Sequence, residues 1–253
     1  MYTDEQFEQL EQEERTLTEE AIILMLALLA STKVELETEL RSLYQRYGKD
    51  GVISYAEMRK WVNGKDHRKR LTVLLLFLAD RFSELRDDLT LKFDDFLSEV
   101  VKKESNFFDV NLNADDILTT PWGVDDETWL ARLMDDVELW NVSVANDLKQ
   151  SFIRRDNVED VIERLNKRFT SMEYIIKRLA MTESTAVGSL ARRQIFKELG
   201  IKKYRFYARE GERTCDQCGS LHGLTFPMTA YEVGVTASPI HAHCRCWEVP
   251  IMD

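Results

Sequence analysis

All four cysteines and three of the four histidines lie after residue 200, and their spacing is that of a metal site. Cys215 and Cys218 form a Cys-x-x-Cys pair. After 22 intervening residues, His241 opens the segment His-Ala-His-Cys-Arg-Cys, which ends at Cys246. Two thiolates in one tight turn can reach a single ion, and a His-x-x-Cys pair completes the tetrahedron typical of structural zinc. We therefore predict a structural Zn²⁺ bound by Cys215, Cys218, His241 and Cys244.

The spacing leaves several alternatives open. Cys246 competes with Cys244 for the fourth position, because residues two apart in an extended segment point to the same face. His222 and His243 are weaker candidate ligands. The four cysteines could instead form disulfides or stay free, although a Cys-x-Cys pair rarely closes on itself.

A catalytic metal is the enzymatic alternative, in the form of a zinc-dependent nuclease or other hydrolase with His241 or His243 as the base. Such a metal keeps an open position and needs a nearby acid or base. Only seven residues follow Cys246, which leaves little room for a completing helix. We therefore predict no catalytic residues and no enzyme activity.

The residues before position 200 must position this site, and their pattern predicts helices. Gly and Pro are scarce, 10 and 4 of 253 residues, and helix formers are abundant. Thr3 and Gln6 fit a capping box before a helix that runs through the apolar stretch 21–30. Further helices are predicted over 34–47, over 66 to about 103 as one helix or two in series, from Asp125 or Asp126 as N-cap to 154, over 158–169, and over 171–199 before Gly200.

We therefore expect a mainly α protein: an elongated helical bundle or hairpin with a small C-terminal α+β zinc-knuckle module. Strands are predicted at 204–208 and near 247–249, where aromatic and polar residues mix. Three regions are expected, at 1–110, 111–200 and 201–253. The longest apolar run, ten residues over 21–30, is too short to cross a bilayer, and the acidic start does not resemble a secretory signal. A cytoplasm-like compartment is therefore expected.

Charge is distributed unevenly along the chain. The net charge is −11, which disfavours a protein that simply coats nucleic acid. Residues 1–150 hold 18 basic and 32 acidic side chains, whereas residues 151–213 hold 15 and 9. The basic stretch could contact DNA phosphates or a partner, or could pair with the acidic part of the same or a neighbouring chain. Its candidate contact residues are Arg154, Arg155, Arg164, Lys167, Arg168, Arg192, Arg193, Lys202 and Lys203.

From about residue 40 to the end, the chain resembles the phage Mu F-like minor head proteins, also called phage head morphogenesis proteins. The most specific patches are the segments 213–218 and 241–246. Others are the turn 51–58, Pro121-Trp122 with Trp129, Thr182-Glu183, Gly200, the strand 204–207 and Leu221-His222-Gly223. The sequence departs from the family at Ala242, where proline is common. This departure changes the backbone entering the second knuckle without removing a ligand.

The resemblance implies a virion protein of a bacteriophage, present in few copies inside the head and associated with the portal protein. It implies a role in head morphogenesis, DNA packaging or ejection, and no enzyme activity. Scaffold protein, major capsid protein and packaged double-stranded DNA are further candidate partners, and assembly would occur in the host cytoplasm. Thr182 and Glu183 are expected to anchor the helix to the metal module, with Arg178 a candidate partner for Glu183. Arg213 is expected to bond metal-bound sulfur.

Overall fold

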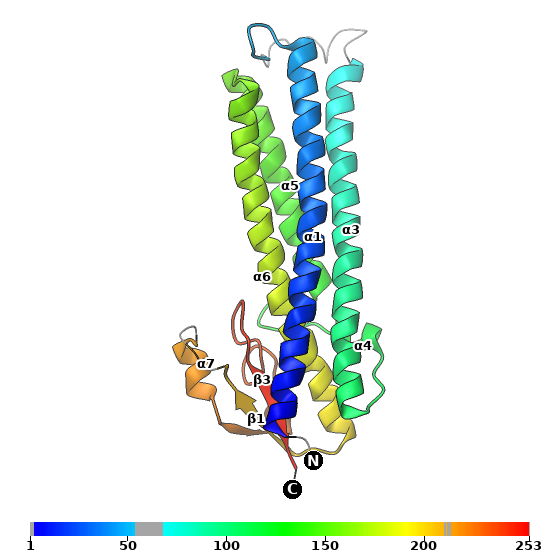
Figure 1. Ribbon diagram of the computed structural model, residues 1–253, viewed down its shortest axis with the longest axis vertical. Helices are drawn as coiled ribbons and strands as arrows, with labels where there is room; N and C mark the ends of the chain where they lie inside the picture. The colour runs from blue at the N-terminus through cyan, green and yellow to red at the C-terminus, as the bar shows by residue number, and fades with distance from the viewer. Residues whose placement is uncertain (1–2, 54–67, 210, 212–213, 253) are drawn as a thin grey trace. The chain divides into compact units, whose positions relative to one another are not determined.

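The computed structural model describes residues 3–53, 68–209, 211 and 214–252. Helices make up most of these residues (Figure 1), as predicted. They are α1 (Asp4–Tyr47), α3 (Arg68–Phe108), α4 (Ala114–Leu118), α5 (Trp129–Arg154), α6 (Val158–Glu198) and α7 (Asp216–Leu221). Among the described residues, none of these helices combines the length and apolar character needed to cross a membrane.

The predicted capping box at the start of α1 is confirmed. The Thr3 amide donates to the Gln6 side chain at 2.9 Å, and the Gln6 amide donates back to the Thr3 hydroxyl at 3.3 Å. The helix then continues to Tyr47, so the two segments predicted from the sequence form one helix. A run without Gly or Pro gives the backbone no local reason to stop.

The start of α5 differs from the prediction, whereas the end of α6 agrees with it. The N-cap of α5 is Thr128, whose hydroxyl accepts from the Ala131 amide at 3.3 Å, and not Asp125 or Asp126. The end of α6 follows the prediction, because Gly200 has a φ of +68° and the Ile201 amide returns to the Phe196 carbonyl at 2.9 Å. The segments 158–169 and 171–199 are parts of this one helix.

The C-terminal part contains a three-stranded antiparallel sheet with the order β2-β1-β3. Its strands are β1 (Lys203–Tyr207), β2 (Thr225–Pro227) and β3 (Trp247–Ile251), and a 3₁₀ turn, η1 (Met228–Ala230), follows β2. Tyr204 and Phe206 are fully buried while Lys203 and Arg205 are exposed, the alternation expected of a strand with one face on a core. The predicted fold class, mainly helical with a small mixed C-terminal module, is confirmed.

The chain divides into two compact units, each built from separate segments. Unit 1 comprises 1–23, 91–133 and 177–253, and unit 2 comprises 24–90 and 134–176. The three regions predicted from the sequence stay a prediction.

Aromatic side chains mark the core of each unit. In unit 1, Phe108 packs against Phe7 and Phe196, with ring centroids 5.8 and 5.6 Å apart. In unit 2, Trp140 lies between Phe82 and Phe169, 5.2 Å from each, and its indole N–H donates to the Arg168 carbonyl at 2.8 Å. The metal-site candidates all belong to unit 1.

Candidate metal centre

The first half of the candidate centre is built on the start of α7. Cys215 is the N-cap of this helix, and its sulfur accepts from the Cys218 amide at 3.3 Å. This cap places the two sulfur atoms of the Cys-x-x-Cys pair on one side of a tight turn. His241 Nε2 lies 3.2 Å from Cys215 Sγ and 3.2 Å from Cys218 Sγ. The structure thus brings together three of the four predicted ligands.

The orientation of His241 suits a ligand. Its Nδ1 lies 2.7 Å from the carbonyl oxygen of Ala242, which can only accept a hydrogen bond, so Nδ1 carries the proton. The unprotonated Nε2 then faces the two sulfur atoms. Fixing the tautomer through the other ring nitrogen is the usual arrangement of a metal-binding histidine.

The second half of the centre adds two more sulfur atoms. Cys218, Cys244 and Cys246 have their sulfur atoms within 4.8 Å of one another, with Cys218 Sγ and Cys244 Sγ 3.8 Å apart. Cys218 therefore belongs to both groups of three ligands. No disulfide joins these cysteines, although all four are described.

These distances fit the proposed metal. Four ligands at zinc's bond lengths of roughly 2.0–2.3 Å stand roughly 3.5–3.8 Å apart in a tetrahedron. The observed separations of 3.2 and 3.8 Å lie close to that range. Thiolate and imidazole donors are the set that zinc prefers. This cluster could therefore bind a metal ion.

The surroundings of the sulfur atoms are apolar. Cys218, Cys244 and Cys246 are buried with Phe206 and Ala208, and Leu221, Phe226 and Ile240 pack against them. Burial raises the pKa of the Cys218 thiol to about 12, and the neighbouring Cys244 adds to this. A hydrogen bond from Cys246 lowers the pKa of Cys244 to about 6, against the effect of burial. The pKa values of these two neighbouring thiols are therefore shifted in opposite directions.

His222 and His243, the weaker candidate ligands, lie outside these two groups of three. His222 Nδ1 lies 3.2 Å from both the amide and the carbonyl oxygen of Ala208. The His243 amide donates to the Thr182 hydroxyl at 3.1 Å, and its Nδ1 lies 3.4 Å from Met181 Sδ. Both side chains thus make other contacts in unit 1. Arg213 lies outside the described residues.

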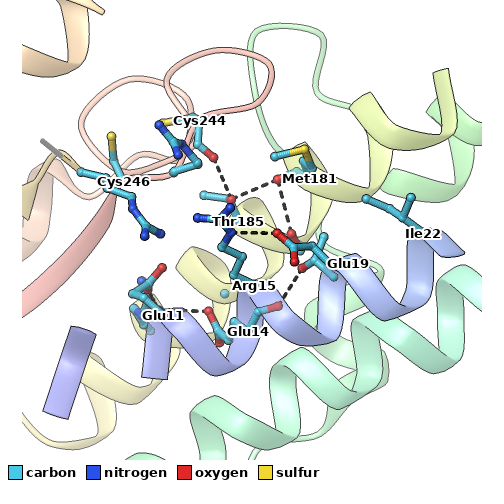
Figure 2. Close-up of a pocket in the computed structure, with 15 residues that line it drawn as sticks. Glu11, Glu14, Arg15, Glu19, Ile22, Met181, Thr185, Cys244 and Cys246 are labelled. Carbon is cyan, nitrogen blue, oxygen red and sulfur yellow. Dashed lines mark hydrogen bonds and ion pairs between the residues drawn. The ribbon is translucent and has the colours of Figure 1, made fainter. Parts of the chain in front are cut away.

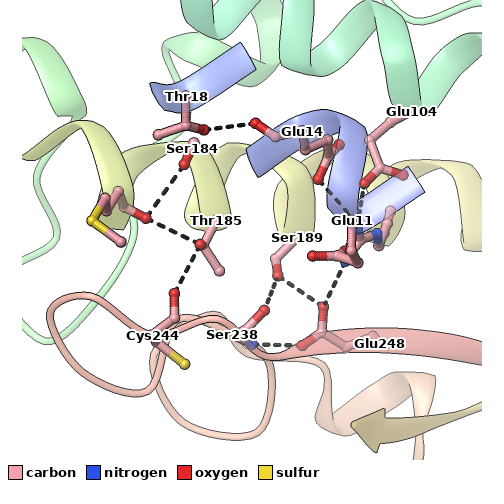
Figure 3. Close-up of polar contacts among 12 residues, drawn as sticks. Glu11, Glu14, Thr18, Glu104, Ser184, Thr185, Ser189, Ser238, Cys244 and Glu248 are labelled. Carbon is pink, nitrogen blue, oxygen red and sulfur yellow. Dashed lines mark hydrogen bonds and ion pairs between the residues drawn. The ribbon is translucent and has the colours of Figure 1, made fainter. Parts of the chain in front are cut away.

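The loop that carries the second half of the centre is fixed directly to α6. Besides the Thr182 contact, the Thr185 hydroxyl donates to the Cys244 carbonyl at 3.1 Å, as Figure 3 shows. One turn further along, the Ser189 hydroxyl donates to Glu248 at 2.8 Å. Glu248 is fully buried, and it also accepts from the Tyr231 hydroxyl at 3.1 Å and the Ser238 amide at 2.6 Å. One face of α6 thus anchors both the ligand loop and β3.

Thr182 and Glu183 have different partners. Thr182 accepts from the His243 amide, and its hydroxyl also donates to the Arg178 carbonyl four residues earlier at 2.7 Å. Glu183, 2% exposed, accepts instead from the Trp122 indole at 2.9 Å and lies 3.3 Å from Arg132. Arg132 also covers the Trp122 ring, 4.2 Å from its centroid. Two separate patches of the resemblance, Pro121-Trp122 and Thr182-Glu183, therefore meet in space.

The predicted basic residues have different surroundings and lie in both units. In unit 2, Arg168 pairs with Asp147 at 2.6 Å, Lys167 with Glu163 at 2.9 Å, and Arg154 and Arg164 both pair with Asp156. Arg155, Lys202 and Lys203 are exposed and Arg193 is half-buried. Arg192 is 2% exposed and surrounded by carboxylates, so the expectation of a DNA contact does not extend to it.

The sequence reasoning missed the group of carboxylates around Arg192. Glu11, Glu14 and Glu104 bring oxygen atoms within 4.8 Å of one another, and Glu11 and Glu104 both pair with Arg192. Burial raises the pKa of Glu11 to about 7, although Arg192 opposes the shift. The available signal was local: Glu11 and Glu14 lie three residues apart, on the same side of a helix.

Residues 142–249 match the family described as Phage Mu protein F like protein. No curated protein and no solved structure matches the chain. The match covers less than half of the chain, but it includes the second half of α5, all of α6 and the whole cysteine–histidine cluster. The resemblance noted in the sequence is therefore confirmed over residues 142–249.

Proposed function

We propose that the chain is a minor head protein of a bacteriophage. In this proposal it is carried inside the virion near the portal vertex and acts in head assembly and in DNA packaging or ejection. The observation that carries the proposal is the family match over residues 142–249, which contain both the long helix α6 and the candidate metal ligands. The same family resemblance implies assembly in the host cytoplasm and several copies per virion.

A structural Zn²⁺ is the second part of the proposal, with Cys215, Cys218, His241 and Cys244 as its ligands. A zinc ion would supply positive charge to a buried group of thiolates and would cross-link α7 to the segment 241–246. Four protein ligands leave no position for a reacting water, which favours a structural site over a catalytic one. Arg213 near the first knuckle stays a candidate hydrogen-bond donor to metal-bound sulfur.

We propose that the metal-bound module presents a surface to the portal protein. Two hydrogen bonds tie that surface to α6: the His243 amide donates to Thr182, and the Thr185 hydroxyl donates to the Cys244 carbonyl. In this proposal the metal completes the surface, and its loss would disrupt it. Scaffold and major capsid proteins are alternative partners. DNA contact would be limited to exposed cations such as Arg155, Lys202 and Lys203, because Arg168 and Lys167 have acidic partners and the chain as a whole is acidic.

Metal content tests the zinc site. We expect about one zinc per chain by mass spectrometry for the wild type and for Ser220→Ala, an exposed control on α7. Cys215→Ser should lose the metal and melt at a lower temperature, because zinc binding in small modules is coupled to folding. A wild type without metal, or a Cys215→Ser variant that keeps its zinc, would contradict the proposed site.

Portal binding and nuclease activity test the function. We expect the wild type and Ser220→Ala to co-sediment with portal rings of the same phage, and Cys215→Ser to stay in the supernatant. Failure of the wild type to bind would contradict the portal assignment. DNA cleavage that disappears in His241→Ala while folding persists would instead support the nuclease alternative.

A further inference from the structure

Four carboxylates surround one guanidinium inside unit 1. Arg192 lies 2.5 Å from Glu104, 3.4 Å from Glu14 and 4.0 Å from Glu248, and it also pairs with Glu11. Ionised together, these carboxylates carry four negative charges against one positive charge. Buried charge is costly unless it is compensated. With all four carboxylates ionised, the single charge of Arg192 would leave most of their negative charge uncompensated.

The four carboxylates are not equally satisfied. Glu248 accepts from Ser189, Tyr231 and the Ser238 amide, so its hydrogen bonds are complete. Glu104 is fully buried, yet its Oε2 has no hydrogen-bond partner, and neither has Oε1 of Glu14, a residue that is 9% exposed. Such atoms normally have a partner, and here the carboxylates of Glu11, Glu14 and Glu104 lie close together (Figure 3).

Space is available beside the two carboxylates, next to their other oxygen atoms, which contact Arg192. Gly188 on α6 faces the group, and a Cβ there would lie 3.5 Å from Glu104 Oε1 and 3.7 Å from Glu14 Oε2. A cavity of about 110 Å³ adjoins the same place and is lined by Glu11, Glu14, Thr18, Ser184 and Gly188, among others. Figure 2 shows Glu11 and Glu14 on one side of it and residues of α6 on the other. A small ion with attached water could therefore reach the carboxylates.

Other charges line this cavity. Arg15 pairs with Glu19 at 2.9 Å, and Arg209 and Arg245 also contribute to the wall. Despite these cations, Oε1 of Glu14 and Oε2 of Glu104 lack a hydrogen-bond partner.

We propose that Glu11, Glu14 and Glu104 bind a hard divalent cation of the Mg²⁺, Mn²⁺ or Ca²⁺ class. Carboxylate oxygen atoms from separate helices are the ligands that such ions prefer, whereas zinc would favour the sulfur cluster. This site joins α1 to α3 next to Arg192 of α6. It uses none of the sulfur ligands, although Cys244 and Cys246 line the same cavity, and it does not rest on the proposed role in the phage head.

The test uses the full chain and Mn²⁺, whose paramagnetism reports binding directly. We expect the wild type to bind one Mn²⁺ and to melt at a higher temperature with millimolar Mg²⁺, Mn²⁺ or Ca²⁺. Glu104→Gln keeps the volume of the side chain and should weaken Mn²⁺ binding by at least about tenfold. Glu19→Gln, in the same cavity wall but outside the group of three, should bind as the wild type does.

A wild type that binds no Mn²⁺ would overturn the proposal and would indicate that protons compensate the carboxylates. Equal binding by the wild type and Glu104→Gln would overturn it as well. If Glu104→Gln fails to fold, Glu14→Gln decides in its place. Binding that survives in Cys215→Ser would separate this site from the sulfur cluster.

Discussion

The hydroxyl of Thr185 donates a hydrogen bond to the backbone carbonyl of Cys244 at 3.1 Å, although 59 residues separate the two in sequence. This bond places a candidate metal ligand against the middle of α6. The stability of the metal module therefore depends on a helix that contributes no ligand.

Replacing this hydroxyl tests that dependence. Thr185→Val keeps the shape of the side chain but leaves the Cys244 carbonyl without this donor, which typically costs about 1 kcal/mol or more. We expect a lower melting temperature and faster zinc loss to a chelator. Thr170→Val, an exposed position on α6, is the control and should behave as the wild type. Equal chelation rates for the two variants would contradict the anchoring role.

The two candidate fourth ligands can be separated by substitution. We expect Cys244→Ser to lose most of the zinc, because Cys244 lies 3.8 Å from Cys218 and its backbone is fixed by α6. Cys246→Ser should retain the metal with reduced affinity, because in this arrangement Cys246 lies beside the ligands and does not bind the metal itself. The zinc content of each variant is measured after gel filtration. If Cys246→Ser loses the zinc and Cys244→Ser keeps it, Cys246 is the fourth ligand.

The buried contact between Trp122 and Glu183 should contribute measurably to the stability of unit 1. Trp122→Phe removes the indole donor and leaves a nearly fully buried carboxylate with fewer partners, at a cost of about 1–3 kcal/mol. Combining it with Glu183→Gln in a double-mutant cycle isolates the pair. We expect the two effects to be less than additive in urea unfolding, and simple additivity would show that the contact contributes nothing.

Acid should weaken the junction between α5 and α6. Partial burial raises the pKa of Asp156, but hydrogen bonds from Arg164 and Arg154 outweigh it, and the pKa lies below its ordinary value. Such a carboxylate contributes stability above its unfolded-state pKa and loses it as the pH falls through the folded-state value. We expect Asp156→Asn to melt below the wild type near about pH 7, and the gap to shrink below about pH 4. A gap that stays constant over this range would contradict the ion pairs.

Local patterns in the sequence predicted much of the fold and of the candidate site. The capping box at Thr3, the end of α6 at Gly200 and the convergence of Cys215 with Cys218 each depend on residues within a few positions of one another. The pairing of Glu183 with Arg132 and the carboxylates around Arg192 depend on which helices pack together, and periodicity does not encode that choice. Arg192 was counted as a surface cation because arginine is seldom buried without partners, and its partners lie far away in sequence.

The pairing of Arg192 with Glu11 spans 181 residues, and this separation sets an order for folding during synthesis. Unit 2 has all its residues once Ile176 has been made, whereas unit 1 still lacks Lys177–Asp253 at that moment. The first turns of α1 are therefore made long before their partners in α6. Until Arg192 has been made, Glu11 and Glu14 stay in contact with water. Contacts between such distant segments form slowly. A released chain that ends before Arg192 should already protect the backbone amides of unit 2 from hydrogen exchange while those of residues 4–23 still exchange freely.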